Sequence, residues 1–253
     1  MKRSSHFIAA IIIAALGFLP VKPVMSQSLV ADLSEHHVAI TTGFTGAELL
    51  LFGAIEGDGD IVVTITGPDE TVTVRKKDRV GGIWINTDEI AFERVPSFYA
   101  IAATRPLEDV APEDVRESQQ IGAEYIGFTP AKVYRGLRPE QISEFRQALL
   151  RLKQSQNLFS AKVGKITVVS ERLFRTRVWF PANMRPGLYT ASVYLIHDGN
   201  QVSAQTTPLR VEKVGVGAEV YDFAHGQSAL YGIAAILIAA ASGWLAAVAF
   251  RKM

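Results

Sequence analysis

The last part of the chain is an uninterrupted apolar stretch that a lipid bilayer accommodates most readily. No ionisable residue occurs in residues 227–250, and as an α-helix this stretch would extend about 36 Å. Because the hydrocarbon core of a bilayer is about 30 Å thick, we predict a transmembrane helix at residues 228–250. Arg251 and Lys252 follow it directly. Since basic residues favour the cytoplasmic side, we expect residues 251–253 to form a short cytoplasmic tail.

Small residues recur at every fourth position of the predicted span and would form one ridge along the helix. They are Ala235, Ala239, Gly243 and Ala247. Such a ridge allows two helices to approach closely. Alanine is so common here, however, that the spacing also fits an anchor with no specific helix partner. The span contains no acidic residue or histidine, so it offers no group for a proton or ion pathway.

Residues 1–26 have the composition of a secretory signal peptide. Two basic residues precede an apolar run at residues 7–19, and small or tolerated residues precede a cleavage point before Gln27. As a helix the apolar run covers about 20 Å, which is too short to cross the hydrocarbon core. We therefore expect the chain after residue 26 to be exported. This orientation agrees with a C-terminus in the cytoplasm.

Between these two ends the chain has the composition of an acidic, water-soluble domain. The net charge of the whole chain is +1, but it becomes −4 once the five basic residues of the two ends are left out. With no basic stripe and an exported domain, we expect no nucleic-acid partner. The chain contains no cysteine, which excludes a disulfide framework and a cysteine-ligated zinc site.

Residues 27–106 predict an N-terminal β-rich lobe. Segments rich in valine, isoleucine, threonine and aromatic residues alternate there with turns that contain glycine, proline and aspartate. We expect strands at residues 38–42, 48–55, 61–66, 71–75, 83–86 and 98–102. Short strands separated in this way are typical of an antiparallel sandwich.

Residues 107–160 predict a helical segment. Pro112 and Pro139 are each followed by glutamate, a combination that favours the first turn of a helix. After the second proline, a stripe of apolar residues follows a period of 3.6 and consists of Ile142, Phe145, Leu149 and Leu152. We interpret this stripe as a face that packs against the sheet rather than as a groove for a partner.

Residues 161–214 predict a C-terminal β-rich lobe, with strands at 165–169, 173–180, 187–196 and 201–211. The last two are joined by Asp198-Gly199 and form the kind of hairpin found in immunoglobulin-like sheets. Four strands do not easily close a sandwich, so this sheet should pack on the N-terminal strands or on the helical segment. Residues 215–227 would form a juxtamembrane linker.

The predicted fold is therefore mainly β. It combines the strands of an immunoglobulin-like antiparallel sandwich with a helical insertion and one C-terminal transmembrane helix.

Several stretches, in order, resemble the alphaproteobacterial family of putative transmembrane proteins. They are Glu48-Leu49-Leu50-Leu51-Phe52-Gly53-Ala54, Asp60-Ile61-Val62-Val63, Gly82-Ile83-Trp84-Ile85-Asn86, Phe98-Tyr99-Ala100 and Pro186-Gly187-Leu188-Tyr189. The resemblance covers nearly the whole chain. It implies a protein of the Gram-negative inner membrane, associated with sulfite-exporter-type permeases, and it carries no catalytic residues to transfer.

No constellation of residues in the sequence predicts chemistry. Nucleophile-elbow, P-loop and dinucleotide-binding patterns are absent from it. Glu56, Asp58 and Asp60 alternate with glycine but lack the spacing of a calcium loop, so we read them as a solvated turn. We therefore predict no catalytic, cofactor-binding or metal-binding residue. Acidic residues that are distant in the chain can meet in space, so an envelope hydrolase stays an alternative. It is the least favoured one, because the sequence shows no catalytic pattern.

Three large aromatic residues are the candidates for contact with another protein. Trp84, Phe98 and Tyr99 would serve either as an aromatic patch or as part of the sandwich core. The leading hypothesis is a non-enzymatic accessory protein, anchored in the bacterial inner membrane with its large domain in the periplasm. Its partner would belong to an inner-membrane transport or envelope complex. The alternative is a periplasmic sensor module for a small anion or for calcium.

Overall fold

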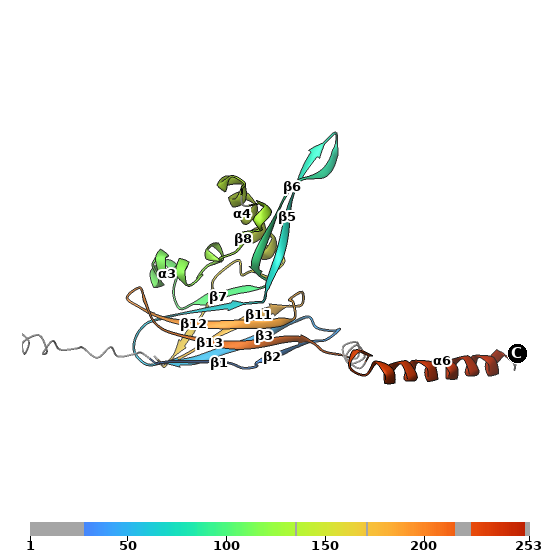
Figure 1. Cartoon of the computed structure of the whole chain (residues 1–253). Helices are drawn as coiled ribbons and strands as arrows, with labels where there is room; N and C mark the ends of the chain where they lie inside the picture. The colour runs from blue at the N-terminus through green and yellow to red at the C-terminus, as the bar shows by residue number, and fades with distance from the viewer. Residues whose placement is uncertain (1–27, 135, 171, 216–223, 251–253) are drawn as a thin grey trace, which may run out of the picture.

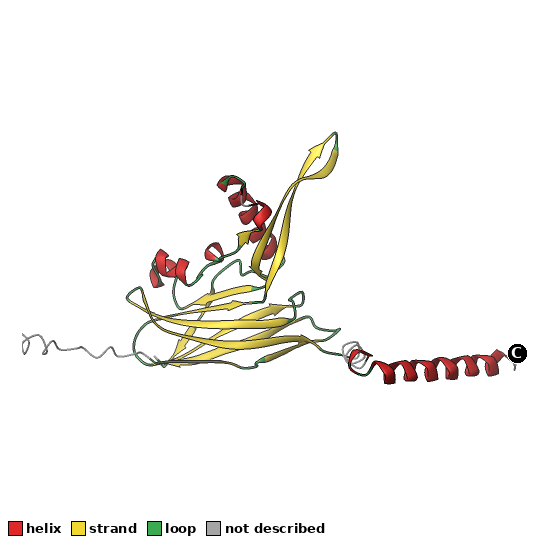
Figure 2. Cartoon of the chain, viewed as in Figure 1, coloured by secondary structure: helices red, strands yellow, loops and turns green. Residues whose placement is uncertain are grey.

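The computed structural model describes residues 28–134, 136–170, 172–215 and 224–250. The predicted signal peptide at residues 1–26, the tail at 251–253 and most of the linker lie outside these ranges. The described chain is mainly β, as predicted, with a sandwich of two sheets, a projecting hairpin, a helical segment and one long apolar helix (Figure 1). The helices of the middle segment and the hairpin lie on one side of the sandwich (Figure 2).

The strands form three sheets, which we call A, B and C. Sheet A is antiparallel, in the order β1 (Leu29–Leu33), β3 (Gly46–Ile55), β11 (Leu173–Pro181) and β10 (Thr167–Val169). Sheet B has the order β2 (His37–Ile40), β13 (Asn200–Lys213), β12 (Gly187–His197), β4 (Asp60–Thr66), β7 (Tyr99–Ala103) and β9 (Gly164–Lys165). Sheet C consists of β5 (Asp69–Val80), β6 (Ile83–Pro96) and β8 (Thr129–Pro130).

The helical elements are mostly short. They are α2 (Leu107–Val110), α3 (Glu113–Ser118), the 3-10 turns η1 (Ala123–Tyr125) and η2 (Lys132–Tyr134), α4 (Pro139–Ser155) and α6 (Ser228–Phe250). Pro139 occupies the first turn of α4, as the sequence predicts. The predicted hairpin is also present, because His197 pairs with Asn200 across Asp198-Gly199, and both turn residues have positive φ.

Strands from before and after the helical segment are combined in both sheets of one sandwich. β3 pairs with β11 in sheet A, and β4 pairs with β12 in sheet B. The sequence left open whether the C-terminal strands pack on the N-terminal strands or on the helices. They do the former, so neither set of strands completes a sheet alone.

Two hydrophobic cores share the strands β4 and β7. The inner core lies between sheets A and B and contains Ile61, Val63, Phe98 and Ala100. The outer core lies between sheet B and the helical segment and contains the alternate residues of the same strands, including Val62, Tyr99 and Ile101. Successive side chains of a strand point to opposite faces, so β4 and β7 are buried on both faces. This explains the apolar run Ile61-Val62-Val63 in β4 and the wholly apolar sequence of β7.

Helix α4 closes the outer core with the predicted stripe, apart from its last residue. Phe145 and Leu149 are buried and Ile142 packs beside them, but half of Leu152 is exposed. The buried position at this end of the helix belongs instead to Lys153, which is only 5% exposed.

Lys153 is held by an ion pair that connects three parts of the fold. Its ammonium donates to the carboxylate of Glu70 at the start of β5 and lies 3.5 Å from the carbonyl oxygen of Ser97. The other oxygen of Glu70 lies 2.9 Å from Nη1 of Arg185, in the loop between β11 and β12. A buried charge is tolerated only when it is paired, so this cluster fixes α4 against the base of the hairpin.

We expect Lys153→Met to lower the free energy of unfolding by about 3 kcal/mol, because it leaves the Glu70 carboxylate buried with only the exposed Arg185 as its partner. The measurement is urea unfolding of the full chain in detergent, followed by circular dichroism. Arg185→Met is the matched control and should cost less than about 1 kcal/mol. Equal losses for the two variants would contradict a special role for the buried lysine.

A second ion pair joins the beginning of β4 to the end of β7. Asp60 accepts hydrogen bonds from Nε of Arg105 at 2.9 Å and from the hydroxyl of Thr104 at 2.8 Å. The hydrogen bond from Arg105 is the main cause that lowers the pKa of the Asp60 carboxyl, against the opposing effect of partial burial. A carboxyl with a lowered pKa stabilises the fold above its ordinary pKa and loses this contribution as the pH falls.

Asp60→Asn should therefore destabilise the domain at neutral pH, by about 1 kcal/mol because Arg105 is exposed to solvent. The difference from the unmodified protein should shrink as the pH falls below about 4, the ordinary pKa of aspartate, and through the lower pKa of the folded Asp60 carboxyl. Urea midpoints of both proteins over this pH range test the sign. A gap that widens in acid would rule out the assigned contribution.

Candidate functional site

The structure separates the three aromatic residues that the sequence nominates for partner contact. Trp84 is 67% exposed near the tip of the hairpin formed by β5 and β6. Phe98 is buried in the inner core, where it stacks on Phe180 with ring centroids 5.1 Å apart. Tyr99 faces the outer core. Among the three, only Trp84 is exposed enough to contact another molecule.

Tyr99 has an ordering role in the outer core. Its hydroxyl donates to the carbonyl oxygen of Gln120 at 2.9 Å and accepts the N–H of Gly122 at 2.8 Å. Burial is the main cause that raises the pKa of this hydroxyl above its ordinary value. The residue therefore stays neutral and fixes the loop after α3 on β7.

The hairpin of β5 and β6 continues the ladder of backbone hydrogen bonds between β4 and β7. Beyond the last pair of that ladder, Gly67 donates to the carbonyl of Phe98 and Ser97 donates to the carbonyl of Pro68, each at 2.8 Å. The ladder then becomes that of β5 and β6. A Cβ at Gly67 would approach Ser97 Oγ to 2.5 Å, so the bend at this point requires glycine. The two most buried strands therefore run directly into the arm seen projecting in Figure 1.

Only the lower half of the arm is packed. Val74, Ile90 and Phe92 belong to the outer core, and Lys76 reaches Glu144 of α4 at 3.2 Å. Every residue from 75 to 89 is exposed. A bulge between Lys76 and Lys77 on β5, opposite an extra residue on β6, marks where the packed half ends.

The tip of the arm is apolar. Gly81 and Gly82 both have positive φ and form the two-residue turn, as a tight hairpin requires. The side chains beside the turn are at least 44% exposed, and we call them the tip patch: Val80, Ile83, Trp84 and Ile85.

A second exposed apolar surface covers the outer side of sheet A, and we call it the outer face. No described element packs on it. The strand register places these residues on the face: Val30, Asp32, Glu48, Leu50, Phe52, Ala54, Leu173, Arg175, Arg177 and Trp179. Trp179 is 55% exposed and lies over Gly46, where any larger residue would collide with the indole ring. Arg177 pairs with Glu48 at 3.4 Å.

Sequence reasoning missed the outer face for a physical reason. In β11 the exposed positions carry Leu173 and Trp179, while the buried positions include Thr176. Polarity therefore does not distinguish the two faces of this strand. Only the pairing with β3 does so, and that pairing connects residues more than a hundred positions apart.

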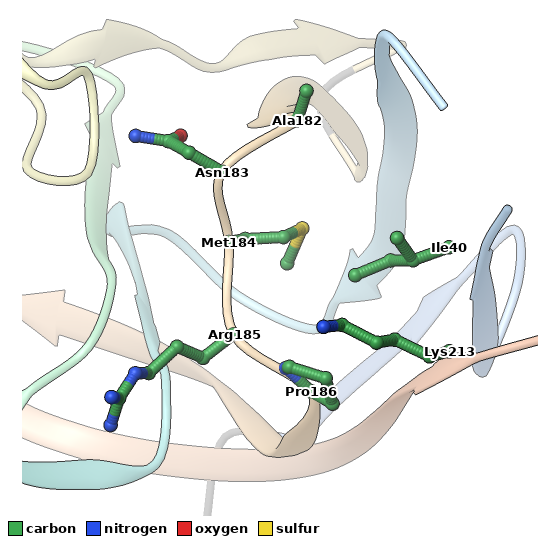
Figure 3. Close-up of a pocket in the computed structure, with 7 residues that line it drawn as sticks. All are labelled: Ile40, Ala182, Asn183, Met184, Arg185, Pro186 and Lys213. Atoms are coloured by element: carbon green, nitrogen blue, oxygen red, sulfur yellow. The ribbon is translucent and has the colours of Figure 1, made fainter. Parts of the chain in front are cut away.

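One hollow lies at the end of the sandwich where β13 leaves it. It has a volume of about 620 Å³ and is lined by Ile40, Ala182, Asn183, Met184, Arg185, Pro186 and Lys213. Met184 points toward Ile40 and Lys213, whereas Arg185 points away from them, toward Glu70 (Figure 3). The hollow thus does not bring its two cations together.

No described group of three or more His, Asp or Glu side chains has the arrangement of a metal site. Glu56 and Asp58 are exposed in the turn between β3 and β4, and the neighbouring Asp60 is engaged by Arg105 and Thr104.

Helix α6 has the length and composition of a membrane span. Its window from Ser228 to Ala247 has a mean hydropathy of 1.9 and none of it is buried against the described domain. The small residues Ala235, Ala239, Gly243 and Ala247 recur at one-turn intervals on it, all exposed.

The described structure defines a β-sandwich protein with a projecting hairpin and one C-terminal helix that can cross a membrane. The chain belongs to the family described as "Putative transmembrane protein (Alph_Pro_TM)", whose model matches residues 28–252. This confirms the family to which the sequence resemblance points. No curated protein matches the chain.

Because Phe98 is buried and Trp84 is exposed, replacing each by alanine should affect the free energy of unfolding differently. Phe98→Ala should lower the free energy of unfolding by about 3–5 kcal/mol, because it leaves a cavity beside Phe180. Trp84→Ala should change it by less than about 0.5 kcal/mol, because the indole has no buried contacts to lose. Urea unfolding of both variants in detergent gives the comparison. A large loss in the Trp84 variant would show that the tip is packed.

Proposed function

We propose that this chain is a non-enzymatic accessory protein, anchored in the bacterial inner membrane by α6, that binds another membrane protein through the outer face of sheet A. The large domain would lie in the periplasm and the C-terminus in the cytoplasm. Basic residues after the span and the signal-like N-terminus support this orientation.

The uncovered outer face is the observation that carries this proposal. Large apolar side chains are exposed here, Trp179 and Leu173 among them, beside the two arginines Arg175 and Arg177. Tryptophan and arginine are the residue types that contribute most at protein interfaces. Exposed apolar surface of this kind on a soluble domain marks a binding site.

The charges on the outer face indicate the chemistry of its partner. Asp32 on this face is paired with His36 and Arg177 with Glu48, whereas Arg175 has no ion-pair partner among the described residues. We infer a partner segment with acidic residues around an apolar centre. An inner-membrane transport protein, such as a sulfite-exporter-type permease, or an envelope complex would present that segment on the periplasmic side.

Site-specific photo-crosslinking in living cells tests the outer face. With a photoreactive residue at position 179, we expect one main adduct with an integral membrane protein. Trp179→Asp should abolish copurification of the same protein in mild detergent, since it places a charge in an apolar contact and repels an acidic partner.

The matched control lies on the other sheet. Leu188 is as exposed as Trp179 but occupies the outer side of sheet B. A photoreactive residue there should give no such adduct, and Leu188→Asp should leave copurification unchanged. Identical adducts from both positions, or a clean monomer in every detergent preparation, would refute the proposed interface.

A further inference from the structure

The tip patch has apolar side chains on both faces of its two-stranded ribbon, whereas the outer face is one side of a sheet. This difference indicates a different kind of binding partner. In an antiparallel ladder, directly opposed residues point to the same face. Val80 opposes Ile83 and Asp78 opposes Ile85, whereas Trp84 opposes Arg79 on the other face. The end of the arm is therefore apolar on both faces.

A protein partner would usually cover one face of such a ribbon, whereas a lipid layer surrounds an inserted tip on all sides. We propose that the tip patch is a lipid-contact site that enters the headgroup interface of a bilayer containing anionic lipids. This inference requires the membrane anchor but not the partner proposed for the outer face.

The charges around the tip fit an anionic lipid surface. Beyond the bulge, from Lys77 to Asn86, the basic residues are Lys77 and Arg79, and Asp78 is the only acidic one. The hydroxyl of Thr87 donates to the Asp78 carboxylate at 2.9 Å. The domain as a whole is acidic, so this end of the arm is distinguished by its charge. Basic residues near anionic headgroups are attracted to the membrane surface.

The backbone sets the depth of insertion. A two-stranded ribbon has unpaired N–H and C=O groups along its outer edges, which excludes it from the hydrocarbon core. Arg79 and Trp84 each stand two residues from the Gly81-Gly82 turn, a distance of about 7 Å. This matches the depth of about 5–10 Å that apolar groups reach at the interface, where tryptophan is also most favoured.

The anchor keeps the arm close to a membrane. The chain from Lys213 to Ser228 can extend at most about 50 Å, so the domain cannot leave the bilayer surface. Tethering raises the effective concentration of a weak contact to about the millimolar range. The four side chains of the tip patch can then contact lipid even when their own affinity for the bilayer is weak.

Quenching of tryptophan fluorescence tests the site with lipid as the only partner. The full chain carries Trp179→Phe and Trp244→Phe, which leaves Trp84 as its sole tryptophan, and is reconstituted into vesicles of phosphatidylcholine with one quarter phosphatidylglycerol. We expect brominated acyl chains to reduce the Trp84 emission about twofold and the emission maximum to shift to shorter wavelength.

Two matched variants make the result specific. Ile83→Asp in the same background should restore the emission without changing the unfolding midpoint, because Ile83 is exposed. A chain with Trp179 as its sole tryptophan should show little quenching. Omitting phosphatidylglycerol should weaken the quenching of Trp84.

Three outcomes would overturn the proposal. They are unquenched Trp84 in anionic vesicles, equal quenching of Trp84 and Trp179, or quenching that survives Ile83→Asp. If Trp84 is unquenched and position 84 forms crosslinks to a membrane protein in cells, the tip is a protein contact instead. Crosslinking from position 179 is a separate measurement, so failure of one proposal does not imply failure of the other.

Discussion

Burial of both faces of β4 and β7 is the constraint on which the architecture depends. A sandwich strand normally presents one buried face, but β7 and the middle of β4, from Ile61 to Ile65, are buried at every position. The inner faces are covered by sheet A. The outer faces, with Val62, Tyr99 and Ile101, would be exposed to water without the helical segment. The helices are therefore a third layer of the fold, not an appendage to it.

The same two strands determine where the arm begins. Because β4 and β7 pair directly and continue into β5 and β6, the base of the hairpin is fixed by the most buried part of the molecule. The Glu70 and Lys153 pair then braces that base against α4. The exposed half of the arm therefore starts from a packed base, and its two strands leave the domain at a fixed point.

Much of this architecture could be predicted from local sequence, because it depends on local physics. The turn at Asp198-Gly199, the helix beginning at Pro139 and the apolar stretch of α6 each carry their signal within a few neighbouring residues.

Long-range pairing could not be predicted in the same way. The exposure of Trp179 depends on its register with Glu48, and the separation of Trp84 from Phe98 depends on how far the hairpin extends beyond its packed base. Lys153 replaces Leu152 in the interior because Glu70, from a distant strand, is there to neutralise it. The 3.6-residue period of apolar residues, taken alone, predicts that Leu152 is the buried residue.

The arrangement of β13 gives the domain a defined mechanical connection to the membrane. β13 is the strand nearest to α6 in the chain. It lies between β12, with which it pairs from Asn200 to Val211, and β2, with which it pairs in parallel at its end. Backbone hydrogen bonds between strands run across the strand direction. A pull transmitted along the chain from the anchor would therefore load many of these bonds together in shear, rather than opening them one after another.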